Sequence, residues 1–436
     1  MPHVRLSARV AVAAALLFAA SPARAAPRVG DADSKPDPAQ FDPNYSDMKE
    51  WAAAGVRGGI PARDATAVFR TLKPGDDVQA AVDAAGKDVT GTVTGSAGGK
   101  DATSGGRVVL LSPGTYPVKK VIDLRPGVVL RGQAKDLVVL ENVMRSPRLT
   151  ADAFTVRFAG VARAGLEDLT VRHAEVARLG LGVYAERVAG AANDPGGVAD
   201  LHVGGVLLAD ATDCWVDNVN VLHSGSHPLE AAGWRATVRD TLIDGAFNKG
   251  EAGSPAGSGN VYFAVTGGLM TRCAIRNTRH GLVVRDTLSG RACAFNVFLD
   301  LDVTGDVNFH GNRRDSGHNL FEGVLVRSLT THGWPAWAYW KREEVGVGNL
   351  AFGSIGWGGS AADAFASTRA DKVYTFTGMR DPNVLGELET PAPAHGTLYA
   401  VTGERPGRLD PAAWPATPGE ARDAMLKRAI PSPAGK

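Results

Sequence analysis

The chain has 436 residues, of which 44% are hydrophobic and 21% are charged, and only 3 are cysteines. This composition is too apolar for an intrinsically disordered chain, and three cysteines cannot build a disulfide framework. The 47 Lys and Arg residues nearly balance the 46 Asp and Glu residues, which gives a formal net charge of +1. So small a charge argues against duplex nucleic acid as the partner.

The N-terminal residues 1–25 have the pattern of a secretory signal. Arg5 and Arg9 lead into an apolar run, 10–20, which is too short to span a bilayer as a helix of about 20 residues. An Ala-Arg-Ala sequence that ends at Ala25 fits the small-x-small pattern of a cleavage site. A membrane anchor is the alternative. We therefore expect cleavage near Ala25, a secreted or periplasmic product, and no membrane insertion.

The segment 26–75 is rich in Pro, Asp and Gly and is predicted to be irregular. A short helix is predicted at 76–86, because Asp76 or Asp77 can cap its start and Gly86 can end it.

From Arg107 onward the chain consists of short β-branched and aromatic runs, each closed by Gly, Pro, Asn or Asp. Asn277 and Asn296 are 19 residues apart, and Asn296 and Asn319 are 23 apart. A period near 20 with strands and no helices predicts a solenoid of β-coils. In such a solenoid equivalent residues stack, and an inward Asn at each bend can bond to the next coil.

The three cysteines, Cys214, Cys273 and Cys293, are expected at the same strand position in their repeats. We interpret them as buried free thiols in an interior stack. A disulfide between neighbouring coils is the alternative.

The start of the solenoid carries a resemblance to a known superfamily. The runs 76–82, 106–116 and 128–132 are similar to the entry of the pectate-lyase-like right-handed parallel β-helix superfamily. The resemblance covers residues 76–360 and implies an all-β fold, a single-stranded right-handed parallel β-helix with a short N-terminal capping helix. It says little about the reaction, because lyases, hydrolases and phage tailspikes share this architecture.

Residues 361–436 lose the coil pattern and are rich in proline, so we expect an irregular C-terminal cap followed by a tail. The predicted organisation is thus a signal peptide at 1–25, an irregular segment at 26–75, a β-helix domain at 76–360, and a cap and tail at 361–436.

The interior of a solenoid is filled, so function is expected on an outward sheet face and in the loops beside it. Between Arg235 and Arg291 there are eight basic and four acidic residues, which predicts a local cationic face. Such a face suits an anionic sugar polymer. A solvated surface with local ion pairs is the alternative.

The sharpest cluster combines Lys249 with Arg279 and His280. Lys249 and Arg279 are 30 residues apart, and the Gly/Ser-rich stretch 250–259 between them looks like an insertion of ten. Without it the gap is one coil of 20 residues, so the two side chains are expected to stack.

An Asn-Lys pair at Lys249, Arg-His-Gly from Arg279, and an Asn-x-Phe strand at 296–298 are together similar to polysaccharide lyase family 6, which includes alginate lyases and chondroitinase B. The resemblance implies that Lys249 is the base, that Arg279 is its acid or charge-stabilising partner, and that Asp244 is a Ca²⁺ ligand. The sequence departs from the family at Leu242, where an acidic ligand is usual.

β-Elimination on a uronate requires a neutral base and a cation or strong donor that stabilises the enolate charge. Arg279, His280 or Ca²⁺ could supply that stabilisation. Repulsion from neighbouring arginines would favour the neutral form of Lys249.

A second cluster lies in the Gly-rich stretch 306–319. His310 or His318 could act as an acid or base, and Arg313 or Arg314 could clamp a carboxylate. A self-bonded turn that ends a coil is the alternative.

Asp306 and Asp315 of the same stretch either contact the substrate or form the carboxylate pair of a glycoside hydrolase. Aromatic faces stack on sugar rings, so Trp337 and Trp340 are predicted to form substrate subsites. A hydrophobic cap over the C-terminal coils is the alternative for these tryptophans.

The leading hypothesis is a secreted, monomeric enzyme that degrades an anionic polysaccharide, most simply a lyase that acts by β-elimination. A glycoside hydrolase on the same scaffold and a non-catalytic carbohydrate-binding surface protein are the alternatives. Ca²⁺ is the only cofactor expected, and neither nucleic acid nor a membrane is expected as a partner.

Overall fold

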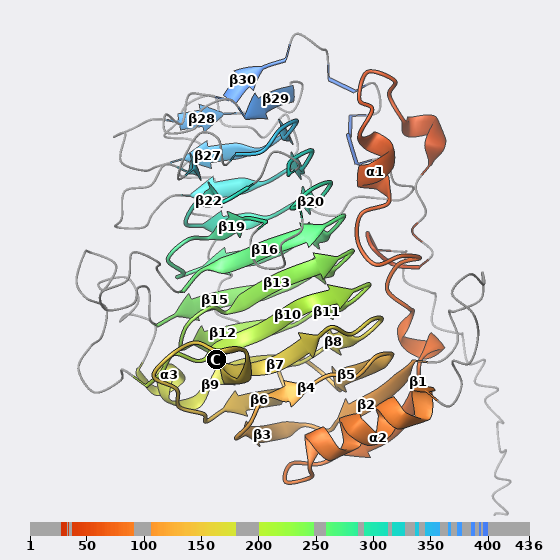
Figure 1. Cartoon of the computed structure of the whole chain (residues 1–436), viewed down its shortest axis with the longest axis vertical. Helices are drawn as coiled ribbons and strands as arrows, with labels where there is room; N and C mark the ends of the chain where they lie inside the picture. The colour runs from red at the N-terminus through yellow and green to blue at the C-terminus, as the bar shows by residue number, and fades with distance from the viewer. Residues whose placement is uncertain are drawn as a thin grey trace, which may run out of the picture.

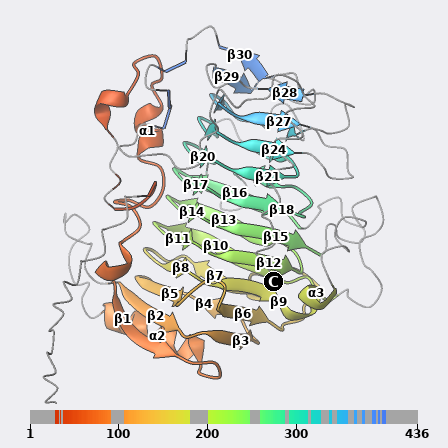
Figure 2. The same cartoon turned by 180° about the vertical axis from the view of Figure 1, so that it is seen from behind.

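The computed structural model describes residues 28–32, 34, 37–90, 106–179, 200–247, 259–286, 292–312, 316–327, 336–339, 345–357, 365–367, 373–376, 385–388, 392–393 and 396–399. Short strands follow one another in a repeating order, and strands of successive coils pair in parallel. The chain therefore winds as a single-stranded right-handed parallel β-helix, as the sequence predicted (Figure 1, and from behind in Figure 2).

Three sheets run the length of the stack, and each complete coil gives one strand to each sheet. The twelve-stranded sheet contains, in spatial order, β1 (Ala67–Leu72), β2 (Arg107–Leu111), β5 (Val128–Gly132), β8 (Gly165–Glu167), β11 (Trp215–Asp217), β14 (Thr237–Arg239), β17 (Leu269–Thr271), β20 (Val297–Leu299), β23 (Leu320–Glu322), β26 (Leu350–Phe352), β29 (Val373–Phe376) and β30 (Leu385–Glu387).

The ten-stranded sheet contains β3 (Gly114–Val118), β6 (Val138–Asn142), β9 (Thr170–His173), β12 (Asn220–Ser224), β15 (Leu242–Ala246), β18 (Ala274–Arg276), β21 (Asp302–Thr304), β24 (Leu325–Arg327), β27 (Ile355–Trp357) and β28 (Phe365–Ser367). The eight-stranded sheet contains β4 (Ile122–Asp123), β7 (Phe154–Ala159), β10 (Gly204–Thr212), β13 (Leu229–Trp234), β16 (Val261–Thr266), β19 (Leu282–Val284), β22 (Val307–Phe309) and β25 (Trp337–Tyr339).

The helices are short apart from α2 (Val78–Thr90). The others are η1 (Pro38–Gln40), α1 (Met48–Ala52), η2 (Arg63–Ala65), η3 (Ala151–Ala153) and α3 (Ala174–Leu179). No helix in the described part of the chain is long and apolar enough to cross a membrane.

Helix α2 packs on β2, β4 and β5 and caps the N-terminal end of the stack, as predicted (Figure 1). It does not end at Gly86 but continues to Thr90. A Cβ at Gly86 would lie only 2.6 Å from Cβ of Arg125, so this glycine permits close packing of the helix on the first coils.

The C-terminal end of the stack is closed by antiparallel strands. β28 pairs antiparallel with β27, and β29 pairs antiparallel with β26 and β30. The cap expected to be irregular thus contains three short strands that reverse the chain direction.

Equivalent residues of successive coils stack in the interior. One such row pairs in register from β11 to β23 and consists of Val216, Val238, Met270, Phe298 and Phe321. The rings of Phe298 and Phe321 are stacked with centroids 4.6 Å apart. Each coil therefore buries its apolar side chains against the next one.

An asparagine ladder joins the later coils at one bend. The Asn296 side-chain amide donates to Oδ1 of Asn319 at 2.9 Å, and the Asn319 amide donates to Oδ1 of Asn349 at 2.9 Å. All three side chains are buried. This confirms the predicted inward Asn for Asn296 and Asn319, whereas Asn277 lies at another corner and bonds to Asp244.

The three cysteines are free and buried, which confirms the interpretation as interior thiols. Burial raises the pKa of each thiol to about 12, so the thiols stay protonated. Their predicted common position is wrong: Cys214 and Cys293 precede β11 and β20 of the twelve-stranded sheet, but Cys273 precedes β18 of the ten-stranded sheet. Connections of unequal length between strands break the equal spacing.

The described residues of 28–65, here called the N-terminal strap, lie along the outer face of the twelve-stranded sheet (red in Figure 1). Trp51 of α1 is fully buried there, and its indole N–H donates to the backbone oxygen of His318 at 2.6 Å. Nearer the N-terminal coils, Val56 and Ile60 pack against Trp215. The strap therefore covers this sheet face and leaves it unavailable for a ligand.

Charged residues of the covered face are paired with one another. Arg131, Glu167, Asp217 and Arg239 occupy one outward row of β5, β8, β11 and β14. Burial raises the pKa of Asp217, but Arg239, Arg63 and Arg28 outweigh it and lower the value to about 2. The buried carboxylate thus stays ionised inside a network of arginines.

We predict that Asn319→Ala lowers the free energy of unfolding by roughly 2–3 kcal/mol. The change removes the buried side-chain bonds to Asn296 and Asn349, and the backbone N–H of Asn296 loses its acceptor. Chemical denaturation measured by circular dichroism checks this value. The control is Asn44→Ala at an exposed turn, which should change stability by less than about 0.5 kcal/mol. Equal effects of the two variants would contradict a structural role for the ladder.

Candidate functional site

The outer face of the eight-stranded sheet carries polar residues that the core does not need. In register from β13 to β22, one outward row consists of Glu230, Tyr262, Val283 and Asn308. The neighbours of Tyr262 along its strand, Val261 and Phe263, point inward and are fully buried. Because side chains alternate between the faces of a strand, Tyr262 and its row point away from the core.

A buried histidine–aspartate pair lies at the start of β19 and β22. Nδ1 of His280 is 2.8 Å and 3.0 Å from the two carboxylate oxygens of Asp306. Asp306 also accepts hydrogen bonds from the Gly281 N–H at 3.3 Å and from the Asn308 amide at 3.1 Å. The carboxylate therefore takes the Nδ1–H of His280, which places the lone pair of a neutral imidazole on Nε2.

Arg279 precedes this histidine and is half-buried. Burial lowers the pKa of its guanidinium, while Tyr262 and Asp306 act in the opposite direction. No carboxylate in the described part of the chain forms a salt bridge with Arg279. A half-buried cation of this kind favours an anionic ligand.

Arg285 of the predicted cationic face lies close by, over Tyr262. The other described arginines of that face have carboxylate partners or lie elsewhere. Arg235 pairs with Asp213, Arg239 with Asp217 and Arg272 with Asp240, all at the twelve-stranded sheet. Arg276 lies on β18 of the ten-stranded sheet. The sequence therefore predicted one cationic face where the structure divides the arginines among three sheets.

Asn260 joins three neighbours of the site. Its backbone N–H donates to Nδ1 of His227 at 3.1 Å, and its Oδ1 accepts the His280 N–H at 3.3 Å. Its side-chain amide donates to the hydroxyl oxygen of Tyr262 at 2.7 Å. The backbone of His280 and the phenol of Tyr262 are thus held by the two ends of one amide.

His227 supports Tyr262 from the side, with ring centroids 4.8 Å apart in an edge-on arrangement. Burial, together with the charges of Arg285, Arg279 and His202, lowers the pKa of His227 to about 3. His227 is therefore neutral, and since Nδ1 accepts a hydrogen bond, its proton lies on Nε2.

Arg285 lies over Tyr262, with its guanidinium carbon 5.1 Å from the ring centroid. Glu230 is beside Tyr262 on the preceding strand. Burial raises the pKa of Glu230, and Arg285 partly offsets this. We call Arg279, His280, Asp306, Asn260 and Tyr262, with Arg285 and Glu230 beside them, the outer-face site.

Sequence analysis identified Arg279, His280 and Asp306 of this site but missed Asn260 and Tyr262. The signal for Tyr262 was present, because alternation along Val261, Tyr262 and Phe263 places the tyrosine opposite two apolar residues. Nothing in the sequence marks Asn260.

Several predicted residues fall outside the described residues: Lys249, Arg313, Arg314, Asp315 and Trp340. His310 is described and directly follows β22, where its N–H donates to the Val284 oxygen at 3.1 Å. It thus lies at the other end of the same sheet strands as His280.

Three predicted contacts of the substrate are corrected by the structure. Trp337 is 1% exposed and packs against Phe321 and Phe376 in the core, because it pairs in register with the inward Val307. No sugar can stack on it.

His318 lies at the twelve-stranded sheet, where Nδ1 is 2.8 Å from Asp47 of the strap and the ring stacks on Phe295. It anchors the strap and is not part of the outer-face site. Asp306 is fully buried against His280, so it is not a substrate contact or half of an open carboxylate pair.

Asp244 lies on β15 of the ten-stranded sheet and accepts a hydrogen bond from the Asn277 amide at 2.7 Å. Among the described residues, no three His, Cys, Asp or Glu side chains come together as metal ligands. The Ca²⁺ site expected at Asp244 remains a prediction.

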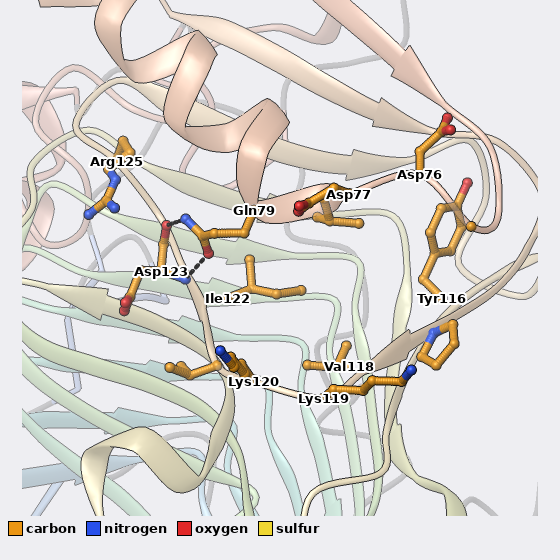
Figure 3. A pocket seen from close by; sticks show the side chains of 14 residues that line it. Asp76, Asp77, Gln79, Tyr116, Val118, Lys119, Lys120, Ile122, Asp123 and Arg125 are labelled. Carbon is orange, nitrogen blue, oxygen red and sulfur yellow. Dashed lines mark hydrogen bonds between the residues drawn. The ribbon is translucent and has the colours of Figure 1, made fainter.

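A cavity of about 610 Å³ lies at the N-terminal cap, between the start of α2 and the β3–β4 turn (Figure 3). Its polar wall serves the fold: the Gln79 amide bonds both backbone groups of Asp123, and Asp77 accepts the Ala80 N–H at the helix start. Lys119 and Lys120 on the other side are exposed. This cavity shares no residue with the outer-face site.

No protein-family model matches the chain, and no curated protein matches it. Similar solved structures include a pectin methylesterase from Aspergillus niger, with 11% identity and a TM-score of 0.37 over 67% of this chain and 86% of that one. The A-module of a mannuronan C-5 epimerase from Azotobacter vinelandii has 15% identity and a TM-score of 0.31 over 66% and 87%. A pectin methylesterase from Erwinia chrysanthemi has 14% identity and a TM-score of 0.29 over 58% and 70%. Likenesses this distant carry no argument about the reaction.

We predict that His227 makes the protein sensitive to acid. Its pKa is about 3 in the folded state against an ordinary value of 6.5, so below pH 6.5 the unfolded chain binds a proton that the folded chain does not. This contribution is absent above pH 6.5, and stability falls by up to about 1.4 kcal/mol per pH unit as the pH drops toward 3.

His227→Gln keeps a hydrogen-bond acceptor but cannot titrate. Denaturation of both proteins at pH 7 and pH 4 should therefore show a smaller acid loss for the variant. The same loss in both proteins would contradict a His227 that stays neutral in the folded state.

Proposed function

We propose that the protein is an enzyme that modifies an anionic, uronate-containing polysaccharide and cleaves it by β-elimination. The observation that carries the proposal is the half-buried guanidinium of Arg279, which forms no salt bridge with a described carboxylate, next to the His280–Asp306 pair. The first group suits a substrate anion, and the second suits proton transfer.

The uronate carboxylate is proposed to bind at Arg279. The proton on the adjacent ring carbon is weakly acidic until that carboxylate is neutralised, because its removal places negative charge on the carboxylate oxygens. A fixed guanidinium in a partly desolvated position stabilises that charge as it develops. Arg279 thus lowers the barrier to proton removal in addition to binding the sugar.

Nε2 of His280 is proposed to take the proton. Asp306 holds the ring in the required tautomer and stabilises the imidazolium that forms, and it is itself fixed by the Gly281 N–H and the Asn308 amide. Lys249 remains the base that the family resemblance implies. Variants of both residues decide between them.

The described site fits a glycoside hydrolase and a non-catalytic binding protein less well. A glycoside hydrolase needs two carboxyl groups across the bond, and Asp306 is committed to His280. A non-catalytic carbohydrate-binding protein does not need an oriented histidine–aspartate pair. The lyase therefore uses more of the described site than either alternative.

The test incubates the protein with alginate, pectate and chondroitin and follows the ultraviolet absorbance of the unsaturated uronate product. We expect His280→Ala to lower kcat by about 10²- to 10⁴-fold. Arg279→Ala should lower kcat and also raise KM. Arg125→Ala, at an exposed position between β4 and β5, is the matched arginine control and should leave both constants unchanged.

Three outcomes would contradict parts of the proposal. New reducing ends without absorbance indicate a hydrolase, and polymer binding without any product indicates a binding protein. If Lys249→Ala abolishes elimination while His280→Ala retains full activity, the lyase stands, but Lys249 and not His280 is the base.

A further inference from the structure

The orientation of the Asn260 amide is fixed by its partners. A backbone N–H can only donate, so the atom that faces the His280 N–H must be the amide oxygen. The other end, 2.7 Å from Tyr262, is then the NH₂ group. The hydroxyl oxygen of Tyr262 is therefore a hydrogen-bond acceptor from Asn260.

This arrangement determines where the phenol proton points. Since the NH₂ group of Asn260 occupies one acceptor position of the Tyr262 oxygen, the O–H of Tyr262 must donate in another direction. The same NH₂ group would remain as a donor to the phenolate oxygen after the proton has left. Tyr262 is thus held in a geometry that suits proton donation to a ligand.

Charged side chains also lie around Tyr262. Arg285 lies over the ring at 5.1 Å, and the charge of Arg279 acts on Tyr262 as well. His227, packed on the ring edge, is neutral, and burial raises the pKa of Glu230 toward the neutral form. Two arginine cations, a neutral histidine and a glutamate whose pKa is raised by burial therefore surround the phenol.

Tyr262 and His280 are two functional groups in one fixed relation. They come from successive coils, and both bond to the side chain of Asn260. Arg279, the proposed carboxylate site, lies next to His280 in the chain. A sugar bound at Arg279 therefore has a base and a hydroxyl donor on residues that one amide holds together.

We propose that Tyr262 is the catalytic acid that protonates the leaving glycosidic oxygen, an assignment that rests on the proposed lyase function. His280 Nε2 removes the proton α to the carboxylate, and the electron pair of that C–H bond forms the new C=C bond. The C–O bond at the β-carbon breaks with its electrons on oxygen. That oxygen takes the proton of Tyr262. The phenolate then regains a proton from solvent, and the imidazolium of His280 releases one to solvent.

A purely structural phenol is the competing explanation, so the test uses a leaving group that needs no acid. Tyr262→Phe and His280→Ala are assayed on the natural polymer and on a uronate with fluoride at the β-carbon. We expect Tyr262→Phe to lower kcat on the polymer by about 10²- to 10⁴-fold but to act on the fluoride within about tenfold of the unaltered protein. His280→Ala should lose activity on both substrates.

The pH profile gives a second readout that a structural role would not move. The alkaline limb of kcat/KM should follow ionisation of the phenol. Replacement of Tyr262 by 3,5-difluorotyrosine, a more acidic phenol of nearly the same size, should shift that limb to lower pH. This measurement keeps the inference testable if Tyr262→Phe does not fold.

Each outcome decides between the claims. If Tyr262→Phe loses activity equally on both substrates, or keeps full activity on the polymer, or if difluorotyrosine leaves the alkaline limb in place, Tyr262 is not the acid and the lyase proposal stands. If the unaltered protein eliminates neither substrate, the proposed function fails and the role of Tyr262 falls with it.

Discussion

Backbone hydrogen bonds between successive coils hold equivalent residues about 4.8 Å apart, and this register governs the rest of the molecule. In the interior it stacks apolar side chains such as Phe298 on Phe321. On the outer face of the eight-stranded sheet it brings together Tyr262, His280 and Asp306 from three successive coils. The paired strands set the distances between these residues, so no long loop is needed to bring them together.

The division of charge between the sheets follows from what covers each face. The N-terminal strap brings Arg28 and Arg63 to the twelve-stranded sheet, where Asp217 and its neighbours neutralise them. The buried charges there form salt bridges with one another, and these salt bridges hold the strap in position. Arg279 lies on a different sheet without such a partner among the described residues. Similar arginines thus have a structural role at one sheet and a proposed ligand-binding role at another.

The features that repeat from coil to coil could be predicted from the sequence, and the contacts that occur only once could not. The spacing of Asn296 and Asn319 predicted a solenoid because stacked coils require a repeat. Trp337 was misjudged because its inward direction depends on pairing with Val307, which composition does not reveal. Strand alternation marked Tyr262 as outward, but the contact of His280 with Asp306 depends on turn geometry between coils. The residues outside the described part, Lys249 among them, remain predictions.

The strap joins the first part of the chain to coils that are made much later. Trp51 bonds to a residue 267 positions further on, and α1 packs near β23 and β26. At a synthesis rate of about 5–20 residues per second, the strap waits on the order of tens of seconds for its docking surface. Until then the apolar side chains of Met48 and Trp51 stay exposed. A chain that stops short of β23 therefore keeps them exposed, and chaperones and proteases can recognise it as incompletely folded.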